Sequence, residues 1–214
     1  MHDYDDLDGA DTLMSARFRG YLPVVVDIEC GGFNAKTDAI LEISAVILGM
    51  SEKSVLQIEQ TYFHRVIPFE GSNIEDAALK FTGIDPWHPL RIARSEKDVF
   101  NDLFKAIRTS MKSNGCKRAI LVAHNAHFDH GFINAAAARH DLKRNPFHPF
   151  SSFDTATLSG LAYGQTVLAR ACEAAGISFD NKEAHSAKYD AEKTAQLFCK
   201  IVNRWQSMGG WPLS

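Results

Sequence analysis

The chain has 214 residues, 45% of them hydrophobic and 23% charged, with a formal net charge of -3. A chain of this length can bury a sizeable core as one globular domain, so a second domain is not required. Its apolar runs fall short of the ~20 residues that a membrane span needs, and its acidic, polar start is unlike a signal peptide. We therefore expect a cytoplasmic protein with no membrane partner, in which residues 1–214 form a single domain and residues 1–16 a flexible N-terminal extension.

The cysteines and the distribution of charge further limit the kind of protein that this chain can be. The cysteines form no CxxC pair, which argues against a disulfide framework or a cysteine zinc site, and we expect free thiols at Cys30, Cys116, Cys172 and Cys199. Acidic residues crowd the first twelve positions, whereas basic residues gather in "RFR", "KSNGCKR" and "RHDLKRN". Charge alone favours an ordinary solvated surface for these clusters.

The first half of the chain is dominated by predicted strands. "YLPVVVDIEC" (residues 21–30) is a short β-branched run typical of a buried strand, and residues 39–50 and 60–69 give two more. Short, turn-rich links join the three, which predicts an antiparallel meander. A short helix is expected over residues 74–81, closed by "TGIDP".

Helices and strands alternate in the second half. Residues 95–115 place Val99, Leu103, Ile107 and Met111 four apart and stop at a glycine, which predicts a helix. A buried strand (residues 118–125), a helix (128–142) and a brief strand (147–153) follow. The last predicted helices cover residues 154–164, 164–176 and 186–210. Strands first, then strands alternating with helices, indicate a mixed α/β sheet flanked by helices.

Two carboxylates interrupt the first buried strand. In "VVVDIEC", Asp27 and Glu29 are two residues apart, so both side chains leave the same face of the strand. Neighbouring carboxylates repel one another and raise each other's pKa unless a cation lies between them. Unless the strand simply frays into a solvated polar end, this pair indicates a metal site.

Two later segments supply further candidates. Asp129 lies near the start of a helix directly after a buried strand, where open α/β folds bind ligands. In "HSAKYD", a spacing of five places His185 just before the last helix and Asp190 inside it. Asp154 looks like a helix N-cap rather than a site residue. Carboxylate oxygens suit Mg²⁺ or Mn²⁺, and two such ions can act together on a phosphodiester.

The motifs "DIE", "HNAHFD" and "HSAKYD" resemble, in their order and separation, the exonuclease motifs of the DEDDh group. The resemblance implies a ribonuclease-H-like fold and a magnesium-dependent 3′-to-5′ exonuclease. It also implies that two Mg²⁺ ions, replaceable by Mn²⁺, are held by Asp27, Glu29, Asp129 and Asp190. His185 is then the general base, and the products are nucleoside 5′-monophosphates.

A closer resemblance spans nearly the whole chain. "GGFNAKTDAILEI", "GCKRAILVAHNAHFDH" and "FCKIVNRWQSMGGWPLS" are similar to the bacterial ribonuclease T family. This resemblance implies a homodimer that trims the 3′ ends of tRNA and other stable RNAs and also acts on single-stranded DNA. It further implies aromatic stacking on terminal bases by Phe33, Phe81, Phe128 and Phe150. Phe33 has independent support, because it follows "GG" after the strand, where a large ring has little core to enter.

The same resemblance gives the basic clusters a role. It implies a patch with which one subunit holds RNA for the active site of the other, formed by Arg17, Arg19, Lys112, Arg118 and Lys143. One position departs from the family, which carries a glutamate that works against 3′-terminal cytosine where this chain has Ala77. Alanine has no hydrogen-bonding group, so we expect a weaker penalty for 3′ cytosines.

Three other functions compete with this interpretation. The histidines of "HNAHFDH" could hold zinc, although their spacing is not that of a helical HExxH motif. The chain could be a silent nucleic-acid-binding module, although all four carboxylates and the histidine are present. It could also be a DNA proofreader or a small-oligonucleotide exonuclease of the same group, which the motifs alone do not separate.

Overall fold

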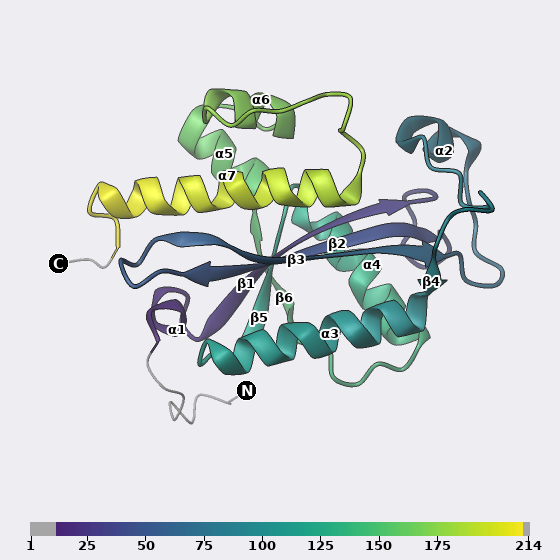
Figure 1. Cartoon of the computed structure of the whole chain (residues 1–214), viewed down its shortest axis with the longest axis horizontal. Helices are drawn as coiled ribbons and strands as arrows, with labels where there is room; N and C mark the ends of the chain where they lie inside the picture. The colour runs from purple at the N-terminus through teal and green to yellow at the C-terminus, as the bar shows by residue number, and fades with distance from the viewer. Residues whose placement is uncertain (1–11, 212–214) are drawn as a thin grey trace.

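The computed structural model describes residues 12–211 and is built around a six-stranded mixed sheet (Figure 1). The strand order is β4-β3-β2-β1-β5-β6. The pairs β1/β2 and β2/β3 are antiparallel, whereas β1/β5 and β5/β6 are parallel. This arrangement confirms the predicted meander and the mixed α/β sheet.

The observed strands follow the predicted runs closely. They are β1 (Tyr21–Cys30), β2 (Ile40–Met50), β3 (Leu56–Ile67), β4 (Arg94–Ser95), β5 (Arg118–Ala123) and β6 (Phe147–Asp154). The third strand starts earlier than predicted. Its first residues, "LQIEQ", include several polar side chains and therefore give only a weak apolar signal. The two-residue strand β4 was not predicted, since no periodicity can show in so short a segment.

Helices cover both faces of the sheet. They are α1 (Leu13–Arg17), α2 (Asp76–Thr82), α3 (Glu96–Ser113), α4 (Ala126–Arg139), α5 (Thr155–Tyr163), α6 (Leu168–Ala174) and α7 (Ala187–Ser207). In Figure 1, α7 crosses one face of the sheet and α3 runs along the opposite face. As predicted, Asp154 is the N-cap of α5, where its side chain accepts hydrogen bonds from the backbone N–H groups of Ala156 and Thr157.

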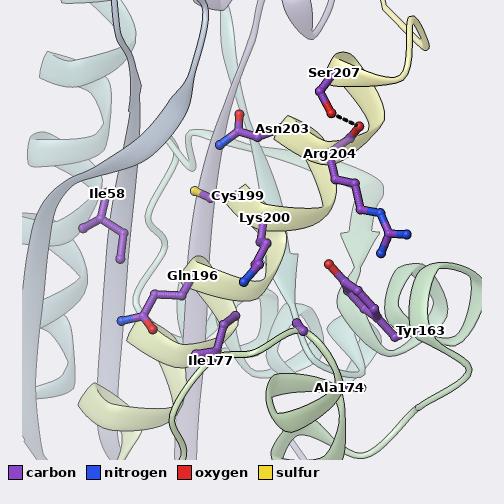
Figure 2. Close-up of a pocket in the computed structure, with 11 residues that line it drawn as sticks. Ile58, Tyr163, Ala174, Ile177, Gln196, Cys199, Lys200, Asn203, Arg204 and Ser207 are labelled. Atoms are coloured by element: carbon purple, nitrogen blue, oxygen red, sulfur yellow. Dashed lines mark hydrogen bonds between the residues drawn. The ribbon is translucent and has the colours of Figure 1, made fainter.

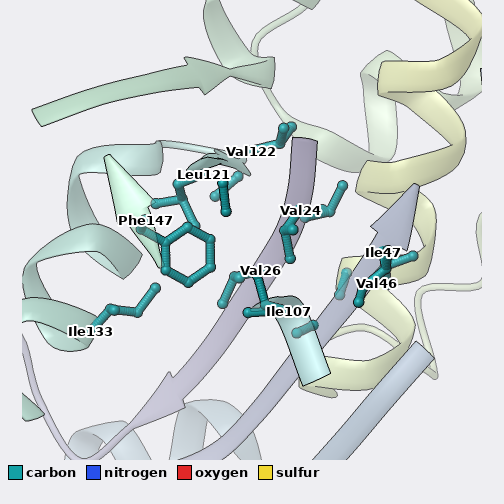
Figure 3. Packing of buried hydrophobic residues seen from close by; sticks show 14 of the residues in the cluster. Val24, Val26, Val46, Ile47, Ile107, Leu121, Val122, Ile133 and Phe147 are labelled. Atoms are coloured by element: carbon teal, nitrogen blue, oxygen red, sulfur yellow. The ribbon is translucent and has the colours of Figure 1, made fainter. Parts of the chain in front are cut away.

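The core lies between β1 and the helices on either side (Figure 3). Val24 and Val26 of β1 are buried, and Val25 between them is buried as well. Because β1 is central and covered on both faces, its sequence is an almost continuous apolar run. Ile107 shows how α3 contributes, since its predicted apolar stripe is buried against this cluster.

The N-terminal expectation needs a correction. Residues 1–11 of the predicted flexible extension lie outside the described residues, but residues 12–16 do not form part of a flexible segment. Thr12 and Ser15 form a capping box for α1, and Met14 is 1% exposed. Thr12 Oγ1 also donates a hydrogen bond of 2.5 Å to the Asn114 carbonyl after α3. A helix this short escapes sequence patterns because packing, rather than propensity, holds it.

The structure also bears on the cysteines and on membrane-spanning segments. All four cysteines are buried and free, as predicted. Within residues 12–211, no helix combines the length and apolar character that crossing a bilayer requires.

Candidate active site

The carboxyl end of β1 carries the first pair of predicted site residues. Asp27 and Glu29 leave one face of the strand, and Glu29 is 9% exposed. The strand lies between the antiparallel β2 and the parallel β5, so its end opens beside the loop that follows β5. This is the edge at which open α/β folds place ligands.

Asp129 reaches this edge from α4. The backbone at Asn125 turns with φ 69°, in the left-handed region, and α4 then begins, with Asp129 in its first turn. The Oδ1 atom of Asp129 accepts a hydrogen bond of 3.0 Å from the backbone N–H of Ile28, the residue between Asp27 and Glu29. This bond fixes α4 against β1 and brings the third carboxylate to the first two.

His185 and Asp190 arrive from the start of α7. As predicted, Asp190 lies inside the helix, while His185 precedes it with φ 66°. The His185 backbone N–H donates to Asp190 Oδ2 at 2.9 Å. One ligand atom from each of Glu29, His185 and Asp190 lies within 4.8 Å of the others. Asp190 Oδ1 is buried and has no hydrogen-bond partner.

The electrostatics of the cluster reflect crowding of like charges. Burial, followed by the charges of Asp129, Glu29 and other nearby carboxylates, raises the pKa of Asp27 well above its ordinary value. Burial and the charges of Asp190 and Glu42 raise the pKa of Glu29 to about 7. Burial also raises the pKa of Asp129 and of Asp190. The cluster is therefore unfavourable when fully ionised without a counter-ion.

Glu42 is a fifth carboxylate that sequence reasoning missed. It lies opposite Glu29 in the β1/β2 register, is 8% exposed and forms an ion pair with Arg65 at 3.5 Å. Its charge contributes to the raised pKa values of Asp27 and Glu29. Only the cross-strand register could have revealed it, because nothing in the spacing along the chain marks the position.

The donor set fits hard divalent cations. Asp27, Glu29, Asp129 and Asp190 offer only carboxylate oxygens, which Mg²⁺ and Mn²⁺ prefer. The buried Asp190 Oδ1 atom without a partner, together with the raised pKa values, shows that the protein alone does not satisfy this cluster. A cation bound among these oxygens would supply both the missing partner and the missing charge.

Three of the four predicted phenylalanines lie beside this cluster. Phe33 and Phe81 are 85% and 67% exposed, and Phe128 directly precedes Asp129. The Phe81 ring centroid is 4.2 Å from that of His185, and the Phe33 centroid is 6.1 Å from that of Phe128. Exposed rings around the carboxylates form a surface on which nucleobases can stack.

Phe150 does not lie with the other three rings. It is near the start of β6, where its ring is 4.5 Å from His148, and His148 is 5.7 Å from Tyr21 at the start of β1. At ~3.3 Å per residue, the six residues from Tyr21 to Asp27 span ~20 Å, so the ring group of Tyr21, His148 and Phe150 lies toward the other end of β1 from the carboxylates. Within one chain, Phe150 therefore stands apart from the three rings beside the carboxylates.

The predicted basic residues gather at the same end of the sheet as Phe150. Arg19 precedes β1, Arg118 begins β5 and the two strands pair there, at Tyr21 and Arg118. Arg17 ends α1, Lys112 lies in the last turn of α3, and Lys143 precedes β6. In Figure 1, α1 lies beside this end of α3. These five residues, Arg17, Arg19, Lys112, Arg118 and Lys143, are called the basic patch below, and the patch lies away from the carboxylates of its own chain.

Other hollows of the surface do not contain the site. Figure 2 shows one along α7, lined by Tyr163, Lys200 and Arg204 among others, and none of the predicted site residues lines it. The zinc alternative finds no support either. Both ring nitrogens of His124 are engaged, with Thr155 Oγ1 at 3.0 Å and the Thr166 carbonyl at 2.8 Å. Across residues 12–211, the histidines of "HNAHFDH" form no group with ligand atoms close enough for one ion.

Comparison with known proteins identifies an exonuclease family. The family model RNase_T, described as an exonuclease, matches residues 24–198. Ribonuclease T of Hahella chejuensis (strain KCTC 2396) is 66% identical over 198 residues, which is 92% of this chain and 91% of that protein.

Solved structures show the same fold at low identity. E. coli exonuclease I in complex with a dT13 oligonucleotide has a TM-score of 0.67 and 15% identity, covering 88% of this chain and 42% of its own. The nuclease domain of 3′hExo, a DEDDh family member bound to rAMP, has a TM-score of 0.64 and 21% identity, covering 86% of this chain and 92% of its own. These likenesses confirm the predicted ribonuclease-H-like fold. The family model and the 66% identical relative together show that this chain belongs to the ribonuclease T family of DEDDh 3′-to-5′ exonucleases.

Proposed function

We propose that the enzyme trims the 3′ ends of tRNA and other stable RNAs, and that it also degrades single-stranded DNA from the 3′ end. The observation that carries this proposal is the convergence of four carboxylates, His185 and exposed phenylalanine rings at one edge of the sheet. The relative named ribonuclease T supports RNA as substrate, and the exonuclease I complex with an oligonucleotide supports single-stranded DNA.

Metal binding belongs to the same proposal. Two Mg²⁺ ions, replaceable by Mn²⁺, would be held by the oxygens of Asp27, Glu29, Asp129 and Asp190. When bound, such ions lower the pKa of water and stabilise the leaving oxygen of a phosphodiester. The support from this chain is its crowded, oxygen-only donor set, whose repulsion a cation relieves.

His185 is proposed as the general base. It precedes α7 on an exposed segment, and its ring can reach the space between Glu29 and Asp190. In the reaction, His185 takes a proton from water as the water oxygen bonds to the terminal phosphorus. The bond from phosphorus to the 3′ oxygen breaks, which leaves a 3′ hydroxyl on the shortened chain and releases a nucleoside 5′-monophosphate.

The aromatic rings are proposed to hold the terminal bases. Phe33, Phe81 and Phe128 are available within one chain, and stacking on such rings contributes ~1–3 kcal/mol per base without strict sequence preference. Stacking would place the last phosphodiester over the carboxylates because the rings surround them.

A homodimer completes the proposal. Phe150 and the basic patch lie toward the end of the sheet away from the carboxylates of their own chain, and we propose that they serve the active site of a second copy. An apolar hollow adjoins the patch and offers a surface to bury in the dimer, since Phe153, Leu161 and Trp205 line it together with Arg17 and Arg19. The activity would reside in a single domain of a cytoplasmic protein, which four free cysteines favour.

A time course on a 5′-labelled RNA hairpin with a short 3′ tail tests the proposal. The wild type and Asp27→Ala should be compared with Mg²⁺ and with chelator. We expect shortening from the 3′ end only in the wild type with Mg²⁺, because Asp27→Ala removes a metal ligand while relieving charge repulsion in the fold. RNA that stays intact with the wild type would contradict the proposed activity, and full turnover by Asp27→Ala would remove Asp27 from the site.

A further inference from the structure

The loop that carries Phe33 and the segment that leads to Phe81 are joined by hydrogen bonds. Residues 31–39 connect β1 to β2, and residues 72–75 precede α2. The backbone N–H of Asn73 donates to the Thr37 carbonyl at 2.8 Å, and the N–H of Ala39 donates to the Asn73 carbonyl at 3.1 Å. Further along, the N–H of Glu75 donates to the Gly31 carbonyl at 2.7 Å. These hydrogen bonds therefore hold the two segments together as one structural unit beside the active site.

Asp38 lies at the centre of this unit. Its side chain is buried, at 2% exposure, and accepts hydrogen bonds from Asn34 N–H at 2.9 Å, Thr37 Oγ1 at 2.8 Å and Asn73 Nδ2 at 3.1 Å. Burial alone would raise the pKa of Asp38, but these three donors outweigh it and hold the pKa below its ordinary value. One carboxylate thus links both segments, and none of its donors belongs to the metal cluster.

Two glycines show how closely the segments approach. A Cβ atom at Gly31 would lie 3.0 Å from the Ile74 Cα and 3.1 Å from the Asn73 carbonyl oxygen. A Cβ atom at Gly32 would overlap the Asp38 carboxylate. The "GG" before Phe33 is therefore required by space at these contacts, which rules out a loosely held loop.

Apart from the contacts of Phe33 with Phe128 and of Phe81 with His185, the two rings have little packing to hold them. Phe33 and Phe81 are 85% and 67% exposed, so backbone position decides where each ring stands. Phe33 lies between Gly32 and Asn34, whose N–H is bound by Asp38. Phe81 lies in α2, which starts directly after Glu75 and its bond to Gly31.

We propose that Asp38 is a positioning residue that fixes Phe33 and Phe81 relative to each other, so that both rings meet the 3′-terminal base as one preassembled pocket. This inference rests on the proposed stacking function of the two rings. Preassembly lowers the ordering cost of binding and thus strengthens the contribution of the terminal base to affinity.

The test uses two 5′-labelled RNAs that differ only in the last nucleotide, which carries adenine or is abasic. The KM of the abasic RNA divided by the KM of the adenine RNA measures how much the terminal base contributes to binding, and this quotient is called the KM ratio below. Asp38→Asn keeps the volume but turns one accepting oxygen into an amide that faces a donor. We expect the ratio to fall at least about threefold in Asp38→Asn, within the range that stacking covers, while kcat and the KM of the abasic RNA stay within about twofold.

Controls separate positioning from general loss of stability. Asn203→Asp is an isosteric change at a residue that bonds the N–H and carbonyl of Leu56, each at 2.8 Å, far from the site. It should lower Tm without changing the KM ratio. In a Phe33→Ala, Phe81→Ala background, Asp38→Asn should have no further effect on the ratio. Asn73→Ala removes one bond of the same unit and should shift the ratio in the same direction if Asp38→Asn does not fold.

The outcomes are distinguishable. An unchanged ratio in both Asp38→Asn and Asn73→Ala would overturn the positioning role, as would an equal rise of KM for both RNAs. A wild type that cleaves both RNAs with equal KM would overturn the stacking function as well, while leaving the exonuclease intact. A wild type that cleaves neither would contradict the proposed substrate.

Discussion

Glu29 shows how a single residue couples metal binding to stability. Its pKa is raised from about 4.5 to about 7 by burial and by Asp190 and Glu42, so the folded protein favours the protonated form. Without metal, this contribution to stability is fully present below pH ~4.5 and is lost as the pH rises to ~7. The expected loss is about 3 kcal/mol, at ~1.4 kcal/mol per unit of pKa.

Denaturant unfolding in chelator between pH 4.5 and 8 measures this effect. In Glu29→Gln, which cannot ionise, the loss of unfolding free energy should be smaller by about 3 kcal/mol. Part of the pH dependence remains in this variant, because the pKa values of Asp27, Asp129 and Asp190 are also raised. Saturating Mg²⁺ should remove the loss in the wild type, since a cation favours the charged carboxylates. Equal pH profiles for wild type and Glu29→Gln would contradict the assigned pKa.

His185 is best tested with a substitution that its backbone accepts. Its φ of 66° lies in the left-handed region, which asparagine tolerates better than alanine. We expect His185→Asn to lower kcat by about 10²–10⁴ with little change in RNA affinity, because it removes the base but leaves the carboxylates. Single-turnover cleavage and binding measurements separate the two quantities. A defect confined to KM would make His185 a substrate contact instead, beside the Phe81 ring that it touches.

At the scale of residues, the sequence alone identified much of this site. Asp27 and Glu29 were predictable because alternation in a strand is a local rule. Asp190 and His185 were predictable from helix spacing. Glu42 was not, since its place opposite Glu29 depends on the length and course of the β1–β2 loop. Asp38, near the end of that loop, carries no spacing signal at all, and its three donors come together only once the chain is folded.

Among the elements, α2 carries Phe81, one of the rings that we propose to contact the terminal base. Ala77 is exposed on this helix, one turn before Phe81, at the position where the family resemblance expects a glutamate. We expect Ala77→Glu to slow cleavage of RNAs ending in cytosine relative to those ending in adenine, because the variant regains a hydrogen-bonding group. Parallel time courses on C-tailed and A-tailed RNAs measure the ratio, with Ala77→Gln as an uncharged control. If the ratio of the cleavage rates on C-tailed and A-tailed RNAs is the same for the wild type and Ala77→Glu, the prediction is contradicted.

Elements with strong periodicity were predictable, and weakly patterned ones were not. The strand β1 and the helix α3 carry long apolar runs or stripes, so packing agrees with local signals. By contrast, α1 has five residues and β4 has two. Both exist because of neighbours distant in the chain, such as Asn114 for Thr12 and β3 for β4.

At the scale of the whole molecule, the separation of the two proposed functional surfaces is the central feature. The carboxylates lie at the carboxyl end of β1, while Phe150 and the basic patch lie at the other end of the sheet. The family resemblance proposes Phe150 as a stacking residue but does not say whether it would act on the active site of its own chain. The register of β1, β5 and β6 places Phe150 toward the end of the sheet that lies away from Asp27 of its own chain.

Subunit mixing tests whether the two surfaces cooperate across a dimer. One parent, Asp27→Asn, has a dead site and an intact patch, whereas the other, Arg118→Ala with Phe150→Ala, has an intact site and a damaged patch. In a mixed dimer, the intact site of the second chain faces the intact patch of the first. Random exchange makes half of the molecules mixed, and each holds one working site, so we expect about a quarter of the wild-type rate per site.

The alternative arrangement predicts a different outcome from the same mixture. If the patch served the site of its own chain, no single chain would combine an intact site with an intact patch, and the rate would stay at the mean of the two parents. Gel filtration of the wild type provides the control, because a monomer would exclude cooperation between subunits altogether. Recovery after mixing would therefore place RNA across two chains, with the patch of one aligning the strand for the carboxylates of the other.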